Sequence, residues 1–359
     1  MEAQMERTLG IFVPARKTQR TLELLHKMKL KLDGFQLSES SGTVGIPLTH
    51  SPSPQEETIL RTELETFQIR EASFHPTSLR PRNLQEALRG KVPPHLASQL
   101  PRSFDVIGDI AIIEFPSAVE PYSVAVVNAV LQANPHVRLV LKKSGDVNGA
   151  FRTRPLQPLT GSGGTETIHK EFGCIYHLDV SSVYFNPRLA HERLRVAKQV
   201  MQAEVVVDMF AGVGPYSVLI AKLQPDSKVY SNDLNPSAIN YLKENVLAND
   251  AADRVIPLLG DARDLSRRGL FNVADRVIMN LPSEALHYLD AAGQILRERG
   301  GVIHFYEFAE RGANLNLVKE EFQAAIEAGH RAVKSYNYVN VIREVAPNKI
   351  QVAIDALIQ

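Results

Sequence analysis

The segment VVVDMFAGVGPYS, residues 205–217, combines an apolar run, an acidic residue and two closely spaced glycines. Three valines lead into Asp208, and Gly212 and Gly214 follow with one residue between them. This order predicts a strand, a tight turn and a helix, which is the opening unit of a nucleotide-binding α/β sheet. Pro215 suits the first helical position, where its missing N–H costs nothing. The segment therefore predicts a site for a nucleoside.

The fingerprint G-x-G-x-x-G of dinucleotide-binding proteins lacks its third glycine here, because Ser217 stands in that place. We therefore expect a ligand that contains a nucleoside and no pyrophosphate. The candidate is S-adenosylmethionine.

Later strands of such a sheet should carry further ligand-binding side chains at their carboxyl ends. An acid about 20 residues after the glycines would accept hydrogen bonds from ribose hydroxyls, and Asp233 in VYSNDLNP stands there. Asp261 in LLGDARDL could accept from the adenine amino group. Asn280 and Pro282 in VIMNLP end the fourth strand. Four successive strands therefore each end in a polar residue that could bind the cofactor, and this order would rarely arise by chance.

Simpler roles stay open for the same residues. Asp233 could form an Asx turn with the Asn-Pro that follows, Asp261 could cap a helix, and Asn-Leu-Pro could be a plain turn. An asparagine can, however, bind the planar edge of a base through its carbonyl and amide. This favours methyl transfer to a ring or exocyclic nitrogen, with positioning supplying much of the rate.

Composition limits the class of protein. The chain has 359 residues, of which 44% are hydrophobic and 22% charged, and its formal net charge is zero. Two or three domains are expected, and a nucleic-acid site must come from local basic clusters. A single cysteine excludes an internal disulfide framework. We expect no membrane segment, no presequence in residues 1–15 and no metal site, because the eleven histidines show no ligand spacing.

From Asn186 onward the sequence alternates between strand and helix patterns. Asn186 is a candidate N-cap and Pro187 a first helical residue. Strands are expected at 204–209, 228–232, 254–258, 275–280 and 300–306, and helices at 216–223, 236–247, 284–298 and 315–328. This alternation predicts a parallel, doubly wound sheet that binds ligands at the carboxyl ends of its strands.

Two smaller regions precede this sheet. Strands at 8–13 and 43–48 with an amphipathic helix at 18–30 suggest a β-α-β module, or a decorated edge of the main fold. Residues 49–58 are rich in proline, serine and charge, which is typical of a linker. In the middle region we expect a hairpin or a kinked strand at 104–115, a helix at 122–131, a strand at 138–141 and a further strand pair within 174–185. The expected domains are a module at 1–55, a linker at 56–65, an α+β domain at 66–185 and the large sheet at 186–359.

Several segments resemble the archaeal and eukaryotic tRNA (guanine-N1) methyltransferases that act at position 37, beside the anticodon. They are RSFDVIGDIAII at 102–113, GAFRTRPLQPLTG at 149–161, TIHKEFG at 167–173, VYFNPRLAHERLR at 183–195, VVVDMFAGVGPYS at 205–217 and DRVIMNLP at 275–282. With the N-terminal module they cover nearly the whole chain. The resemblance implies an α/β fold, in which a C-terminal class I methyltransferase with a Rossmann-like doubly wound sheet follows an α+β domain and a small N-terminal α/β module.

The resemblance also implies roles in methylating guanine N1, which carries a proton. Glu192 matches the glutamate that the family is thought to use as general base. Because an exposed glutamate has a pKa of about 4.3, burial in the closed complex would have to raise it. The alternative is an ordinary ion pair on the helix surface with Arg188 or Arg195. Arg152 matches the arginine that contacts the target base, where it could donate to guanine O6.

The site residues that the resemblance implies are as follows. Catalytic residues are Glu192, Arg152, Asn280 and Pro282. Residues at S-adenosylmethionine are Arg193, Asp208, Phe210, Gly212, Gly214, Asp233, Leu234, Asp261, Ala262 and Asn280. Residues at tRNA are Arg152, Arg154, Tyr184 and Arg188, although Tyr184 could equally be a core aromatic and the basic cluster at 138–154 a solvated face. By the same resemblance, residues 1–55 would bind the outer corner of the tRNA.

Other functions stay open at this point. The nearest rival is a wybutosine-pathway transferase that moves the aminocarboxypropyl group of the same cofactor or methylates the tricyclic base. Inosine at the same position could also be a substrate, because it shares the N1 and O6 edge of guanine. A non-catalytic tRNA-binding protein and a methyltransferase for small molecules or proteins explain less of the sequence. We expect a monomer that works on tRNA in the cytoplasm, the nucleus or both.

Overall fold

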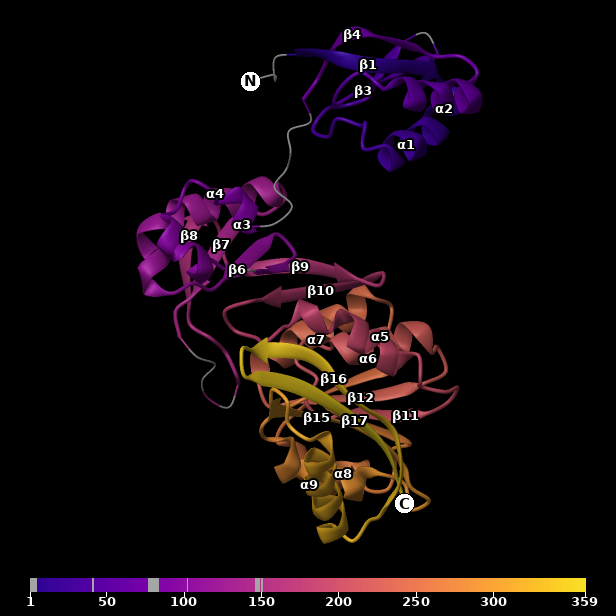
Figure 1. Ribbon diagram of the computed structural model, residues 1–359. Helices are drawn as coiled ribbons and strands as arrows, with labels where there is room; N and C mark the ends of the chain where they lie inside the picture. The colour runs from indigo at the N-terminus through magenta and orange to yellow at the C-terminus, as the bar shows by residue number, and fades with distance from the viewer. Residues whose placement is uncertain (1–4, 41, 77–83, 102, 146–148, 150) are drawn as a thin grey trace. The chain divides into compact units, whose positions relative to one another are not determined.

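The computed structural model describes residues 5–40, 42–76, 84–101, 103–145, 149 and 151–359. The chain divides into two compact units, Met1–Ala87 and Leu88–Gln359. Each unit is described by itself (Figure 1). Among the helices of the described residues, none is long and apolar enough to cross a membrane.

The described residues of the first unit form a four-stranded sheet that shares a core with two helices, and a short third helix ends the unit. Its sheet has the order β2-β3-β1-β4, and the paired strands are antiparallel. The elements are β1 (Glu6–Pro14), η1 (Ala15–Lys17), α1 (Thr18–Lys27), β2 (Ser38–Ser40), β3 (Thr43–Pro47), α2 (Pro54–Leu64) and β4 (Gln68–Phe74). Ile11 and Ile46 of the sheet share one apolar core with Leu25 of α1 and Leu60 of α2. The expected strands and first helix are confirmed, although the helix ends three residues early.

The predicted linker at 56–65 is wrong, because this segment is helix α2. Ser53 is its N-cap and forms a capping box with Glu56, and Pro54 is its first residue. Leu60 and Leu64 are fully buried in the core of the unit. The Ser-Pro composition that resembles a linker is therefore a helix start signal. The unit also continues past residue 55 into β4, which pairs with β1.

The second unit begins with a small mixed sheet of order β5-β6-β7-β8. The elements of this region are η2 (Pro94–Gln99), β5 (Asp105–Ile107), β6 (Ile110–Ile113), η3 (Ser117–Tyr122), α4 (Ser123–Ala133), β7 (Leu139–Lys143) and β8 (Leu156–Gly161), whereas the short helix α3 (Leu84–Ala87) ends the first unit. The predicted hairpin is confirmed, and its turn needs Gly108, since a Cβ there would lie 2.1 Å from Thr167 Oγ1. The expected strand pair within 174–185 is wrong: β10 (Cys174–Asp179) pairs with the preceding β9 (Glu166–Glu171).

The large sheet has seven strands in the order β13-β12-β11-β14-β15-β17-β16. Its strands are β11 (Val205–Asp208), β12 (Lys228–Asp233), β13 (Val255–Leu259), β14 (Arg276–Met279), β15 (Gly301–Glu310), β16 (Val333–Ala346) and β17 (Lys349–Ile358). Two strands that were not predicted complete the sheet and make it mixed, because β17 runs antiparallel to β15 and β16 antiparallel to β17. The other five strands are parallel, as predicted.

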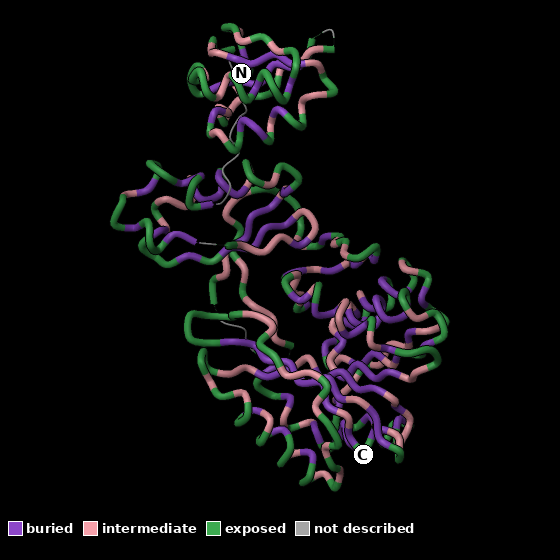
Figure 2. Tube along the Cα trace, turned by 45° about the vertical axis from the view of Figure 1, so that its right-hand side comes forward, coloured by how far each residue is buried: buried purple, intermediate pink, exposed green. Residues whose placement is uncertain are grey.

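Helices cover both faces of this sheet. They are η4 (Pro187–Leu189), α5 (Ala190–Ala197), α6 (Pro215–Leu223), α7 (Pro236–Ala248), η5 (Ala262–Asp264), η6 (Ser266–Leu270), η7 (Ala285–Tyr288), α8 (Leu289–Ile295) and α9 (Leu315–Ala328). Successive strand residues point to opposite faces, so Val206 packs with the cluster of α5, α6 and α7, and Val207 with that of α8 and α9. Figure 2 shows the buried central strands between these layers. The expected helix at 284–298 is shorter and divided into η7 and α8.

Candidate active site

The turn after β11 has the geometry that the two glycines predict. Gly212 and Gly214 have φ angles of 55° and 87°, in the left-handed region that favours glycine. A Cβ on Gly214 would also lie 2.3 Å from Leu242 Cδ1. Pro215 is the first residue of α6. The Gly212 N–H donates to Asp233 Oδ2 at 2.7 Å, which joins this turn to the end of β12.

Asp208, the last residue of β11, is hydrogen-bonded to the helix that follows this turn. It is fully buried, and the Ser217 hydroxyl donates to its Oδ2 at 3.0 Å. Burial raises its pKa to about 7. Neither Asp208 nor Gly214 is among the described residues that line the cavity at the ends of these strands. Both were expected to contact the cofactor, but the structure gives them a role in shaping the turn.

A cavity lies where the carboxyl ends of β11, β12, β13 and β14 meet. Its described lining residues are Phe151, Arg152, Tyr184, Phe210, Gly212, Asn232, Asp233, Leu234, Asn235, Ala238, Gly260, Asp261, Ala262, Asn280, Leu281, Pro282, Tyr288, Phe308 and Gln351. Most of the residues predicted at the cofactor are among them. We call this space the cofactor cavity. Tyr288, Phe308 and Gln351 had not been predicted, because they come from elements without a known motif.

The lining chemistry of this cavity fits a nucleoside. Asp233 accepts from the Asn235 and Gly212 N–H groups, so it forms the Asx turn that was the simpler alternative while still lining the cavity. Burial raises its pKa. Asp261 caps η5, and its ion pair with Arg263 lowers its pKa. Leu234 is 44% exposed and offers an apolar surface for a flat ring, and these carboxylates suit ribose hydroxyls and amino groups.

A second, polar cavity adjoins the first. Its described lining residues are Ser103, Phe104, Asp105, Ile107, Ile112, Glu114, Lys143, Arg152, Arg154, Leu156, Val180, Val183, Tyr184, Phe185, Asn186, Arg188, Arg343, Glu344 and Val345. Arg152 and Tyr184 line both cavities. Arg152 has a φ of 53°, and its Nη1 donates to the Pro282 carbonyl at 2.8 Å. The two residues therefore stand where the cavities meet.

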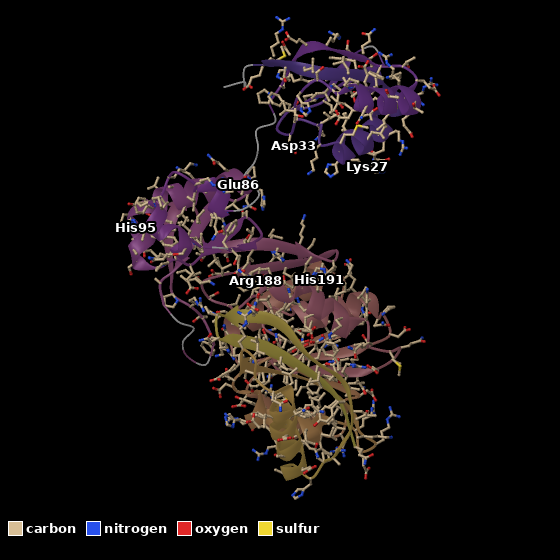
Figure 3. The ribbon with its side chains drawn as sticks, in the orientation of Figure 1. Lys27, Asp33, Glu86, His95, Arg188 and His191 are labelled. Carbon is tan, nitrogen blue, oxygen red and sulfur yellow. The ribbon has the colours of Figure 1, made fainter. Side chains whose placement is uncertain are left out.

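Several cations of the polar cavity already have anionic partners. Arg188, labelled in Figure 3, donates to Asp105 at 2.6 Å from the short turn before α5. Arg154 lies 3.5 Å from Glu114. Arg343, which sequence reasoning missed, comes from β16, and burial lowers its pKa. Its Nε is buried without a partner among the described residues. The cavity thus joins charges from distant parts of the sequence.

Glu192 lies apart from both cavities. It is 8% exposed on α5 and absent from the described lining residues. Arg195 donates to its Oε1 and Oε2 at 2.7 and 2.8 Å, and the Tyr306 hydroxyl donates to Oε1 at 2.7 Å. The simpler alternative, a pair with Arg195, is therefore what the structure contains, although the Glu192 carboxylate is buried and not on the helix surface. Arg193 is likewise buried against Glu171 and absent from the described cofactor cavity, contrary to expectation.

The Glu192 pair belongs to a buried polar network. Arg195 also donates to Asp355 of β17 at 2.5 and 3.1 Å. Asp355 contacts His304 Nδ1 at 2.7 Å and accepts from Gln199 at 2.9 Å. Burial would raise the pKa of Asp355, but the hydrogen bonds from His304 and Arg195 hold it well below its usual range. The network ties α5 to strands β15 and β17.

The strand order, the Gly-Val-Gly-Pro turn and the acidic ends of β12 and β13 together define a class I methyltransferase domain. The sequence matches the TRM5/TYW2 methyltransferase domain over residues 167–334 and the TYW2 N-terminal domain over residues 84–165. The chain belongs to the TRM5/TYW2 methyltransferase family. Within the described residues, no cluster of three or more histidine, cysteine or acidic side chains is placed to hold a metal ion.

Three similar proteins illustrate the relationship. The tRNA (guanine(37)-N(1))-methyltransferase Trm5b of Pyrococcus abyssi is 40% identical over 297 residues, which cover 80% of this chain and 84% of that protein. The solved complex of aTrm5 and tRNALeu covers 98% of this chain and 100% of its own, with 30% identity and a TM-score of 0.73. Methanocaldococcus jannaschii TYW2 in complex with AdoMet covers 72% of this chain and 99% of its own, with 30% identity and a TM-score of 0.56.

Proposed function

We propose that this chain transfers a methyl group from S-adenosylmethionine to N1 of guanosine 37 in tRNA. The observation that carries the proposal is the junction of the two cavities at Arg152 and Tyr184. A base held in the polar cavity would present its edge to the cofactor cavity at this junction. The relatives support methylation of guanosine over the wybutosine-pathway reaction, because the match extends over more of this chain for the Trm5 complex, 98%, than for the TYW2 structure, 72%.

The cofactor cavity would hold S-adenosylmethionine through its strand ends. Asp233 would accept from the ribose hydroxyls, and Asp261 from the adenine amino group. Leu234 and Ala262 would pack on the adenine ring, with Phe210 and Tyr288 closing the slot through an edge-to-face contact at 5.0 Å. The bound cofactor supplies an electrophilic methyl group. The chain itself provides position and electrostatics.

The junction residues would orient guanine and stabilise charge. Arg152 would donate to O6, where negative charge develops as N1 loses its proton. Asn280 would bind the base edge, and the exposed ring of Tyr184 would stack on the displaced base. Glu192 is proposed to accept the N1 proton. This role requires that substrate binding draws its carboxylate away from Arg195 or Tyr306, which hold it in the present conformation.

The first unit would bind a part of the tRNA other than the target base. Its basic residues Lys27, Lys29 and Lys31 lie at the end of α1 and just after it, and suit contacts with phosphates. Figure 3 labels Lys27 on this unit. A tethered module of this kind raises the effective concentration of the tRNA at the site. The compartment, cytoplasmic or nuclear, stays a prediction.

A second candidate is a wybutosine-pathway transferase acting at the same tRNA position. The match of residues 84–165 to the TYW2 N-terminal domain favours it. Aminocarboxypropyl transfer would move a different group of the same cofactor. The two reactions therefore leave different parts of S-adenosylmethionine on the RNA.

The deciding experiment uses two labelled cofactors. The protein is incubated with S-adenosylmethionine labelled either in the methyl group or in the carboxyl group, and with tRNA transcripts that carry guanosine, inosine or adenosine at position 37. We expect methyl label in 1-methylguanosine on the guanosine transcript and none on the adenosine transcript. Carboxyl label in RNA would favour the second candidate. If the methyl-labelled cofactor yields no labelled 1-methylguanosine on the guanosine transcript, the proposal is refuted.

The role of Glu192 has its own test. We expect Glu192→Gln to keep the affinities for cofactor and tRNA and to lower the single-turnover rate by about 100-fold or more. Arg195→Lys serves as the companion variant, because it perturbs the pair while leaving the carboxylate. An unchanged rate for Glu192→Gln would make Glu192 a structural residue.

A further inference from the structure

The turn at residues 280–283, which carries Asn280 and Pro282, is held from two sides. On one side, Arg152 Nη1 donates to the Pro282 carbonyl at 2.8 Å. On the other, the Ser283 N–H donates to Glu307 Oε1 at 2.6 Å. Ser283 has a φ of 75°, a left-handed conformation that costs free energy for a residue other than glycine. The turn therefore depends on outside contacts to keep its shape.

Glu307 is placed to provide such a contact. It lies on β15 beside β14, is 8% exposed, and its Oε1 also accepts from its neighbour's N–H, that of Phe308, at 2.7 Å. Its Oε2 is buried without a hydrogen-bond partner in the described part of the chain. Burial raises the pKa of this carboxyl. The carboxyl therefore keeps one oxygen on the turn while its other oxygen stays buried without a hydrogen bond, which is a costly arrangement.

Both segments that Glu307 joins reach the cofactor cavity. Phe308 follows it on β15 and lines the cavity, as do Asn280, Leu281 and Pro282 of the turn. The carboxylate thus fixes the distance between two walls of one cavity. Arg152 completes the arrangement, since it binds the same turn and also lines the polar cavity.

We propose that Glu307 is a positioning residue that anchors the turn at 280–283, so that Asn280 and Pro282 face the reacting groups. The proposal rests on the proposed methyl transfer for its effect on rate. It acts through geometry, because a displacement of about 1 Å at a reacting centre can cost about 100-fold in rate. Glu307 itself is absent from the described lining of both cavities, so its effect would reach the reacting groups through the turn.

The test compares Glu307→Ala, Glu307→Gln and Glu310→Ala. Glutamine keeps the oxygen that accepts from Ser283, and Glu310 is an exposed residue at the end of the same strand. For Glu307→Ala we expect the single-turnover methylation rate to fall about 100-fold, with the affinity for S-adenosylmethionine changed less than about threefold. Glu307→Gln should recover most of the rate, and Glu310→Ala should behave as the unmodified protein.

A second readout does not depend on activity. Hydrogen exchange at the Ser283 amide should be about tenfold faster in Glu307→Ala than in Glu310→Ala, because its acceptor is gone. Glu307→Gln should keep it slow. Unchanged exchange at Ser283, or a loss of rate in Glu307→Ala that glutamine does not recover, would overturn the proposal. If the unmodified protein forms no 1-methylguanosine, the proposed function fails, and the exchange result still decides the role of Glu307.

Discussion

Replacing Asp355 with alanine tests whether the buried network holds the second unit together. The Asp355 side chain is 1% exposed and interacts with Arg195, His304 and Gln199. Breaking a buried ion pair from one side costs about 3–5 kcal/mol, because the remaining charge loses its partner. This corresponds to a fall in Tm of roughly 6–20 °C for a domain of this size. Calorimetry of the whole chain measures it.

The matched control is Asp253→Ala, whose side chain is 78% exposed and pairs with its neighbour Arg254. A surface pair of this kind contributes about 1 kcal/mol or less. Because the pKa of Asp355 is held below its usual range, its contribution is complete above about pH 4 and is lost only at lower pH. The difference from the unmodified protein should therefore stay constant between about pH 6.5 and 8. A Tm change for Asp355→Ala no larger than that of the control would refute the reasoning.

Three further outcomes are expected. Asp233→Ala should weaken binding of S-adenosylmethionine by about 10- to 100-fold in calorimetry, because charge-assisted hydrogen bonds are lost, whereas Asp253→Ala should bind normally; equal affinities would contradict the assignment. Arg152→Ala should lower the methylation rate by about 100-fold with little change in cofactor affinity, because a donor to developing charge is lost; a change in cofactor affinity alone would point to another role. Asp208→Asn should flatten the dependence of stability on pH. Burial raises the pKa of Asp208 to about 7, so the free energy of unfolding of the unmodified protein should fall by up to about 4 kcal/mol through this group as the pH rises from 4 to 7. If the free energies of unfolding of the two proteins change in parallel with pH, the carboxyl is not responsible.

The parts of the fold that follow from local pattern could be predicted from sequence. The parallel strands β11 to β15 are short apolar runs bounded by turn residues, and the glycine turn needs backbone angles that few residues adopt. The acidic residues at strand ends then meet at one edge, because parallel strands share their direction. For this reason the cofactor cavity contains most of the residues expected there.

Other features could not be predicted because the same residue types are typical of two different structures. Ser53 and Pro54 resemble linker residues, but with Glu56 they start helix α2. The antiparallel strands β16 and β17 were not predicted. Half-buried and exposed residues follow one another irregularly along β16, and its pairing with β17 has several register shifts. Local pattern alone could not resolve these cases.

Local spacing suggests the Glu192–Arg195 pair, but the other partners of these buried charges do not follow from sequence. Glu192 finds Arg195 on its own helix, but Tyr306 and Asp355 come from β15 and β17. Arg343 and Glu307 reach the site from strands whose sequences carry no motif. Such contacts depend on tertiary placement, and only the folded chain brings them together.

The measurement that tests the central claim most directly is the identity of the nucleoside at position 37 after one turnover. The full chain is incubated with S-adenosylmethionine and an unmodified tRNA that carries guanosine 37, and the RNA is digested and its nucleosides identified. The account predicts 1-methylguanosine at that position and its loss when adenosine replaces guanosine. Unmodified guanosine in the presence of bound cofactor, or a base carrying an aminocarboxypropyl group, would contradict it.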